Sequence, residues 1–273
     1  MPANEHTATT ISLRIGNLDL TLVCQDRKLY QLLAKRYHNY LSEKVSDRKI
    51  MLRCGPAAIE NSHDHEVLEF QDDLLKVYAS TYEGWLELET GHGSLVVADE
   101  NPVNAIDYFL RVVFSVLGFQ AGGFLFHGAG IIHNEGVHVF FGYSGSGKST
   151  IAKLSIDKVI LSDDLVLIMP KDGELYVHST PFWNVQDDNS PPVMDKLVGL
   201  YRLVKDRYVL LEPLTGGEAI AEMIASIPVV TLASNYASRL ITCCSTILSA
   251  VPCYRLHFKQ DDSFWEVIQA ERH

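Results

Sequence analysis

Gly142-Tyr143-Ser144-Gly145-Ser146-Gly147-Lys148-Ser149, followed by Thr150, is the stretch of this sequence that decides its fold. It matches the phosphate-binding pattern G-x-x-x-x-G-K-[ST], whose glycines let backbone amides turn inward around phosphate oxygens. In this pattern Lys148 adds a positive charge and Ser149 offers a hydroxyl to Mg²⁺. Residues 137–141 before it are typical of a buried strand, and residues 150–157 after it are typical of a helix whose N-terminus favours an anion. We therefore expect residues 142–150 to bind ATP together with Mg²⁺.

The composition is that of a globular protein, and it argues against several classes. Of the 273 residues, 47% are apolar and 21% are charged, which is ordinary for a soluble domain. Lys and Arg number 23 against 34 Asp and Glu, a formal charge of −11, so the positive footprint of a nucleic-acid groove is missing. No run of about eighteen uncharged apolar residues occurs, so we expect no membrane partner. The polar segment Met1–Thr10 and five cysteines without metal-type spacing favour a reducing, cytoplasmic setting.

Two regions differ in their patterns, and we expect two domains. Residues 1–100 predict a mostly β module with one helix. The β signals are a hairpin around Gly16-Asn17 and short strands at 49–53, 75–78 and 85–88, and the helix is expected at 29–41. Residues 101–273 open with an amphipathic helix at 104–117, then give a strand–loop–helix–strand unit that ends near 162. Such a unit predicts an α/β sheet with its ligand at the carboxyl ends of the strands.

Two carboxylates and one histidine are candidates for chemistry beside the phosphates. Asp163 and Asp164 end the apolar run 159–161, 15 residues after Lys148. If that strand lies beside the one that leads into residues 142–149, its end faces the triphosphate. One carboxylate could then hold Mg²⁺ while the other accepts a proton from an attacking hydroxyl. The alternative is an ordinary turn capped by Asp. His127 lies at the end of another apolar stretch. On local sequence alone, it is more typical of a core histidine whose ring nitrogens have hydrogen-bond partners.

Taken together, Phe126-His127-Gly128, residues 142–149 and Asp163-Asp164 resemble the HPr kinase/phosphorylase family. The catalytic fold of that family is related to phosphoenolpyruvate carboxykinase, so the resemblance implies an α/β P-loop kinase core. It implies that Lys148 holds the transferring phosphate and that Ser149 ligates Mg²⁺, with Asp163 supporting the metal or a water. It also implies that Asp164 accepts the proton of a substrate hydroxyl and that His127 is a catalytic neighbour of the phosphate.

Outside these motifs the sequence departs from the family. The Glu-x-Arg-Gly-x-Gly-type segment that should follow the two aspartates is missing, and residues 175–183 stand in its place. That arrangement resembles divergent HPr-kinase-like proteins, some of which phosphorylate serine on peptides. The resemblance also implies an arginine near the phosphates, for which Arg202, Arg207 and Arg255 are equal candidates. The resemblance is also compatible with a homo-oligomer.

The leading hypothesis is an ATP- and Mg²⁺-dependent kinase that phosphorylates a serine hydroxyl of a protein or peptide. One alternative is a regulatory or assembly protein that binds ATP with little phosphoryl transfer, and another is a kinase of a small metabolite. A transporter-type ATPase is disfavoured because the chain lacks both a Leu-Ser-Gly-Gly-type signature and an apolar strand that ends in Asp-Glu.

Overall fold

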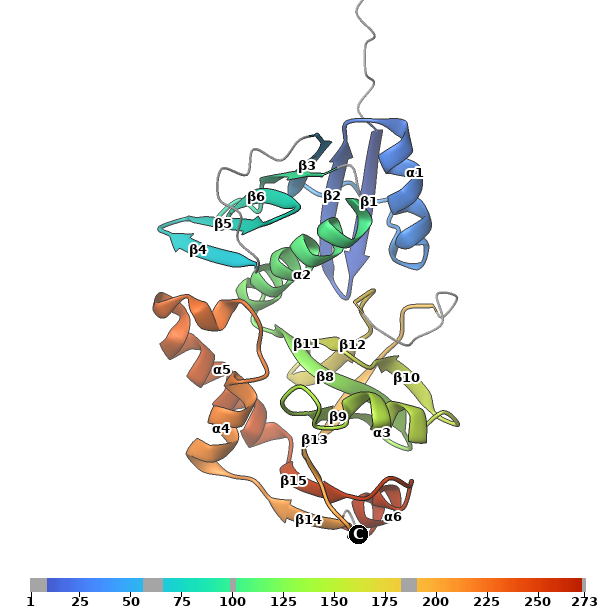
Figure 1. The fold of residues 1–273 in the computed structure, drawn as a ribbon. Coiled ribbons are helices and arrows are strands. Elements are labelled where there is room, and N and C mark those ends of the chain that lie inside the picture. Colours follow the sequence, from blue (N-terminus) through green and yellow to red (C-terminus); the bar gives the residue numbers. More distant parts are fainter. Residues whose placement is uncertain (1–8, 56–65, 99–101, 183–190, 272–273) are drawn as a thin grey trace, which may run out of the picture. The chain divides into compact units, whose positions relative to one another are not determined.

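The computed structural model describes residues 9–55, 66–98, 102–182 and 191–271, and it shows a mixed α/β protein with two multi-strand sheets (Figure 1). The chain forms two compact units, Met1–Leu117 and Gly118–His273. The division therefore falls after Leu117, whereas the sequence pattern placed it after residue 100. The two positions differ because most of the helix that follows residue 100 belongs to the first unit.

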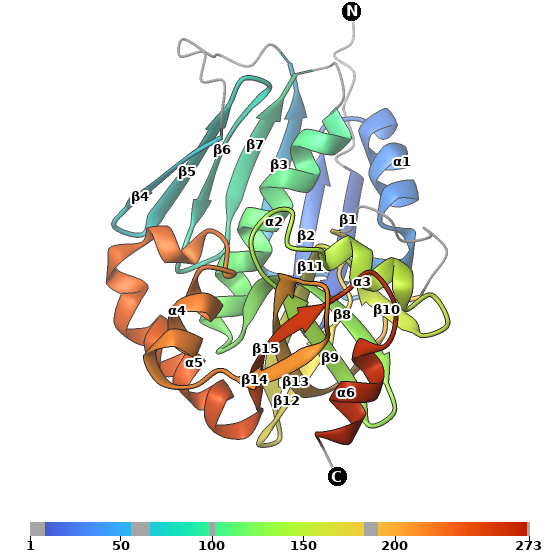
Figure 2. The same ribbon diagram turned by 60° about the horizontal axis from the view of Figure 1, so that its bottom comes forward.

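The first unit is built on a seven-stranded sheet with the strand order β1-β2-β3-β7-β6-β5-β4 (Figure 2). Its strands are β1 (Thr9–Ile15), β2 (Leu18–Cys24), β3 (Lys49–Cys54), β4 (Val67–Gln71), β5 (Leu74–Ala79), β6 (Tyr82–Glu87) and β7 (Gly93–Val97). The predicted hairpin is present, since β1 and β2 are antiparallel and Gly16 supplies the positive φ of their two-residue turn. Helix α1 (Arg27–Arg36) connects β2 to β3, which run parallel.

Helix α1 is shorter than the predicted segment 29–41. It begins where the Asp26 carboxylate accepts the Leu29 N–H at 2.8 Å, an ordinary N-cap. It ends at Arg36 because Tyr37 leaves helical geometry, and a 3-10 turn follows at His38–Tyr40. The buried Tyr37 hydroxyl donates to Asp107 at 2.9 Å, and this bond fixes the end of α1 to the next helix.

Helix α2 (Pro102–Gln120) covers the first sheet and explains the position of the unit boundary. The ring of Phe109 lies so close to Gly84 that a Cβ there would meet it at 2.8 Å. By length and composition α2 could cross a membrane, with a mean hydropathy of 1.3 over its most apolar window. However, 67% of that window is buried inside the fold, as in the core helix of a soluble protein, so α2 is weak evidence for a membrane span.

The second unit holds an eight-stranded sheet, five strands of which pair in a closed ring. The ring runs β8, β11, β12, β13, β9 and back to β8. Its strands are β8 (Phe124–His133), β9 (Gly136–Phe141), β11 (Leu165–Lys171), β12 (Glu174–His178) and β13 (Met194–Lys205). The sheet continues through β10 (Val159–Ser162), β14 (Leu210–Pro213) and β15 (Cys253–Phe258), and the helices are α3 (Lys148–Leu154), α4 (Gly216–Ile224), α5 (Ala237–Ala250) and α6 (Phe264–Ala270).

Strands β9 and β10 are not neighbours, which corrects one expectation from the sequence. β8 lies between them, since Ile131 pairs with His138 of β9 and with Ile160 of β10. Both strands run antiparallel to β8, so they are parallel to each other and their carboxyl ends lie at the same edge of the sheet. The segments that follow Phe141 and Ser162 therefore still converge, although the pairing is not the predicted one.

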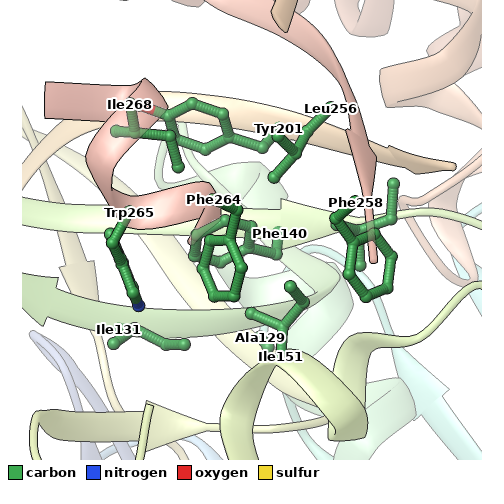
Figure 3. Packing of buried hydrophobic residues seen from close by; sticks show 11 residues of the cluster. Ala129, Ile131, Phe140, Ile151, Tyr201, Leu256, Phe258, Phe264, Trp265 and Ile268 are labelled. Atoms are coloured by element: carbon green, nitrogen blue, oxygen red, sulfur yellow. The ribbon is translucent and has the colours of Figure 1, made fainter. Parts of the chain in front are cut away.

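A buried cluster beneath α3 supports this edge of the sheet (Figure 3). Ile151 of α3 packs with Phe140 of β9, Phe258 of β15 and Phe264 of α6. The Phe140 and Phe264 rings meet edge to face with centroids 5.9 Å apart. Helix α3 ends at Leu154 instead of reaching residue 157. Ser155 leaves the helix and its hydroxyl accepts the indole N–H of Trp265 at 3.0 Å, which ties α3 to α6.

Candidate functional site

A cavity of about 470 Å³ in the second unit brings most of the predicted site residues together. Its wall contains His127 from β8, Lys148 and Ser149 from α3, and the pair Asp163 and Asp164 that follows β10. The other described residues that line it are Ser144, Gly145, Gly147, Thr150 and Lys205. Residues far apart in the sequence thus face one space, as the convergence of β9 and β10 requires.

The glycine-rich loop, residues 142–147, has a backbone that only glycine adopts without strain at three positions. Gly142, Gly145 and Gly147 have φ values of +147°, +79° and +112°. At Gly147 there is also no room, since a Cβ would lie 2.5 Å from the Phe258 ring. The Ser146 hydroxyl is buried, and within the described part of the chain it has no hydrogen-bond partner. The loop is therefore held in one unusual conformation.

Lys148 is buried, with 8% of its surface exposed, and its ammonium turns back onto the loop. It donates to the carbonyl of Gly142 at 2.9 Å and to that of Tyr143 at 3.4 Å. Burial lowers the pKa of Lys148 below its ordinary value, nearby Asp164 opposes this shift, and Arg202 adds to it. An anion that enters the cavity would stabilise the charged form of this partly desolvated lysine.

Ser149 and Asp163 present two oxygens side by side. The Ser149 hydroxyl donates to Asp163 Oδ2 at 3.2 Å, and Asp163 is buried with 3% exposure. Neighbouring ligands of an octahedral Mg²⁺ with Mg–O bonds of 2.0–2.1 Å are separated by about 2.9 Å. The pair is thus close to the spacing that two adjacent ligands need, and both are the hard oxygen donors that Mg²⁺ prefers.

Asp164 contacts His127 and is fixed by the backbone around it. His127 Nε2 lies 3.0 Å from Asp164 Oδ1, and the Asp164 carbonyl accepts the Gly128 N–H at 2.9 Å. The Ser162 hydroxyl accepts the N–H groups of both Asp164 and Leu165, which shapes the turn after β10. His127 is therefore a cavity residue, with a side chain 41% exposed, and not the core histidine that its local sequence suggests.

None of the three candidate arginines lines the cavity. Arg202 comes nearest, because its guanidinium carbon lies 4.6 Å from the centre of the Tyr143 ring. Its Nε donates to Glu222 at 2.7 Å, so the guanidinium lies between Tyr143 of the loop and Glu222 of α4. Arg255 pairs with Glu212 and Glu218, and the backbone N–H of Arg207 donates to Asp206.

Lys205, the last residue of β13, lines the cavity although no sequence motif marks it. Within the described residues its exposed side chain has neither a hydrogen bond nor an ion pair to a carboxylate. The only available signal was its place at the end of an apolar run, which many surface lysines share. Phe258 was likewise not singled out, although its ring fills the space beneath Gly147.

Comparison with known proteins assigns no family. No protein-family model matches the chain, and no curated protein matches its sequence. One similar solved structure is the Hpr(Ser) kinase/phosphatase from Coxiella burnetii, with 11% identity and a TM-score of 0.25. The match covers 33% of this chain and 72% of that chain. A score this low assigns neither fold nor function, so the functional argument depends on the residues of the cavity.

Proposed function

We propose that the second unit is an ATP- and Mg²⁺-dependent phosphotransferase that acts on a serine hydroxyl of a protein or peptide. The observation that carries the proposal is the content of the cavity. A lysine, a hydroxyl–carboxylate pair and a histidine-paired carboxylate face one space of about 470 Å³. These are the groups that phosphoryl transfer needs, because its catalysis depends on positioning and on neutralising charge.

The donor's phosphates would be held by the amides of the glycine-rich loop and by Lys148. Positive φ at the three glycines turns successive backbone N–H groups into a concave surface that suits an anion. The Lys148 ammonium donates to two loop carbonyls, and a phosphate oxygen is a stronger partner than a carbonyl. The lowered pKa of Lys148 should therefore rise towards its ordinary value when ATP binds.

Mg²⁺ fits the Ser149–Asp163 pair only as an ion that arrives with the nucleotide. Among the described residues there is no group of three or more His, Cys, Asp or Glu side chains that could hold a metal. Two protein oxygens completed by phosphate oxygens and water are the usual arrangement for this ion in ATP-dependent enzymes. When bound, Mg²⁺ would neutralise part of the phosphate charge.

Asp164 is the proposed base. The acceptor oxygen attacks the γ-phosphorus, the bond to the β-phosphate oxygen breaks, and ADP leaves as the phosphate ester forms. The hydroxyl proton passes to the Asp164 carboxylate. His127, 3.0 Å away, orients that carboxylate and keeps one of its oxygens occupied, so that the other faces the acceptor. This is the role that distinguishes Asp164 from Asp163, which is buried against Ser149.

The nature of the acceptor follows from the resemblance of residues 126–128, 142–149 and 163–164 to HPr-kinase-like proteins. A peptide or protein serine, ATP as donor and a cytoplasmic setting belong to the same proposal. The formal charge of −11 and the five free thiols agree with that setting and with a partner that is not a nucleic acid.

The test is phosphate transfer from γ-labelled ATP with Mg²⁺ into a lysate of the source organism, with wild type and Asp164→Asn compared. We expect a labelled serine protein or peptide with wild type and a loss of about 100-fold or more in the variant, because general-base catalysis contributes that much. ATP affinity should remain close to that of wild type. Asp172→Asn is the matched control, since Asp172 is an exposed turn residue with positive φ that asparagine tolerates.

Normal turnover by Asp164→Asn would exclude Asp164 as the base. Tight ATP binding without any label specific to wild type would instead favour a regulatory nucleotide-binding protein. Label in a small molecule instead of a polypeptide would identify a metabolite kinase.

A further inference from the structure

We propose that Lys205 is a second phosphate-binding cation of the site, contributed by β13 and directed at the same phosphate chain as Lys148. This inference deepens the proposed function and depends on it. Lys205 lies outside every motif of the sequence, and it enters the cavity only through the pairing of β13 with β9 and β15.

The position of Lys205 places it beside the phosphate end of the cavity. Its Cε lies 3.5 Å from the place where a Cβ of Gly147 would stand, so its side chain reaches the last glycine of the loop. The backbone N–H groups in this part of such a loop face phosphate oxygens. An ammonium at this point is therefore closer to the nucleotide's phosphates than to any acceptor that approaches from outside.

The backbone that carries Lys205 is fixed. Lys205 pairs in register with Phe258, and the Asp206 N–H donates to the Phe258 carbonyl at 2.9 Å. Beyond it, the two ring nitrogens of His257 lie 3.0 Å from Asp206 and 3.2 Å from Glu212. These contacts hold the turn after β13 and hold Phe258 beneath Gly147. A side chain anchored in this way needs to order only its own methylene groups to meet a ligand.

Charge balance gives a reason for a second cation. Among the described residues, the ionised groups that line the cavity, with histidine neutral, are Asp163, Asp164, Lys148 and Lys205, which sum to zero. Without Lys205 the wall would carry −1, in a protein whose formal charge is already −11. Such a wall would repel a triphosphate, and a local cation offsets that repulsion. The carboxylate of the neighbouring Asp206 forms its contacts elsewhere, since it accepts the Arg207 N–H and lies 3.0 Å from His257 Nδ1.

The experiment measures ATP and ADP affinity with Mg²⁺ by calorimetry for wild type, Lys205→Met and Lys205→Arg, over a range of NaCl concentrations. We expect Lys205→Met to weaken ATP binding about tenfold, as for loss of one partly exposed ion pair, while Lys205→Arg retains most of the affinity. Wild type should lose ATP affinity more steeply with salt than Lys205→Met, because one screened charge contact is gone. A merely structural role would not change the salt dependence.

Lys171→Met is the matched control. It removes one exposed positive charge from the far end of β11, where the ammonium lies over the Tyr176 ring and outside the cavity. Circular dichroism and unfolding temperature verify that each variant is folded. Wild-type ATP affinity and salt dependence in Lys205→Met would overturn the inference, and so would an unchanged nucleotide affinity with a raised KM for the acceptor. A wild-type protein that does not bind ATP would overturn the proposed function itself and this inference with it.

Discussion

The cavity has two walls that differ in how their charged groups are held. The first wall is formed by the glycine-rich loop, α3, the part of β8 around His127 and the turn after β10. Its charged groups are paired within the wall: Lys148 with loop carbonyls, Asp163 with Ser149, and Asp164 with His127. The second wall, which is the end of β13 backed by its partner strand β15, instead leaves Lys205 without an ion pair among the described residues. A paired wall is preorganised, whereas an unpaired cation gains its partner only when an anion arrives.

The tightest contact between the two walls is that of the Phe258 ring with Gly147. This contact makes the conformation of the loop depend on β15, a strand more than a hundred residues away in the chain. The second wall thus helps to position the first wall, which contains the residues of the proposed chemistry. Substitutions can separate the two contributions, and the loss of transfer described above for Asp164→Asn is the largest effect expected of the first wall.

Gly147→Ala should have the next largest effect. An added Cβ would meet Phe258 at 2.5 Å and would also require a φ of +112°, so the loop must move. We expect transfer to fall by about 100-fold and the free energy of unfolding to fall by about 1–3 kcal/mol. Gly145→Ala is a matched control, because Gly145 has a φ of +79° but no atom within 4 Å of its Cβ position.

The difference between the two alanine variants measures the contact between the walls separately from backbone strain. Phe258→Leu placed in the Gly147→Ala background should recover part of the lost activity, since it removes the clash but not the strained φ. Equal losses in Gly145→Ala and Gly147→Ala would show that the contact with Phe258 has no part in positioning the loop.

The smallest effect is expected for a substitution that removes a contact holding the second wall, and it concerns the unfolding temperature. The Arg207 backbone N–H, and after it His257, lower the pKa of Asp206. A carboxylate whose folded pKa is depressed stabilises the fold above its unfolded pKa of about 3.9, and this contribution disappears as pH falls through the folded value. Asp206→Asn should therefore unfold at a slightly lower temperature than wild type at pH 7, by at most about 2 °C, and this difference should shrink as pH falls below about 3.9. A difference that did not shrink as pH falls would contradict this origin.

The first wall could be predicted from the sequence because its residues belong to patterns with short spacings. Residues 142–149 and the aspartates 163–164 follow a strand–loop–helix–strand order, and that order places them at one edge whichever strand lies between β9 and β10. The role of His127 could not be derived from local sequence, since an apolar stretch around a histidine is more typical of a core. Only the family resemblance pointed to it, and the structure places it 3.0 Å from Asp164.

The second wall could not be predicted, for a physical reason. Lys205 reaches the cavity through parallel pairing of β13 with β9, whose partners are about sixty residues apart, and such pairing leaves no periodic signal at a single lysine. The division after Leu117 could not be predicted for a similar reason. Phe109 of α2 packs on Gly84 of the first unit, and this contact is not visible in the helical pattern of α2 itself.

The measurement that tests the account most directly is a calorimetric titration of ATP into wild type and into Lys148→Met, each with Mg²⁺ and after its removal by EDTA. We predict saturable binding by wild type that weakens at least tenfold without Mg²⁺, and no measurable binding by Lys148→Met. That variant should nevertheless unfold at no lower temperature than wild type, because it removes a cation whose burial is unfavourable. Absence of ATP binding by wild type, or equal affinity in Lys148→Met, would contradict the account.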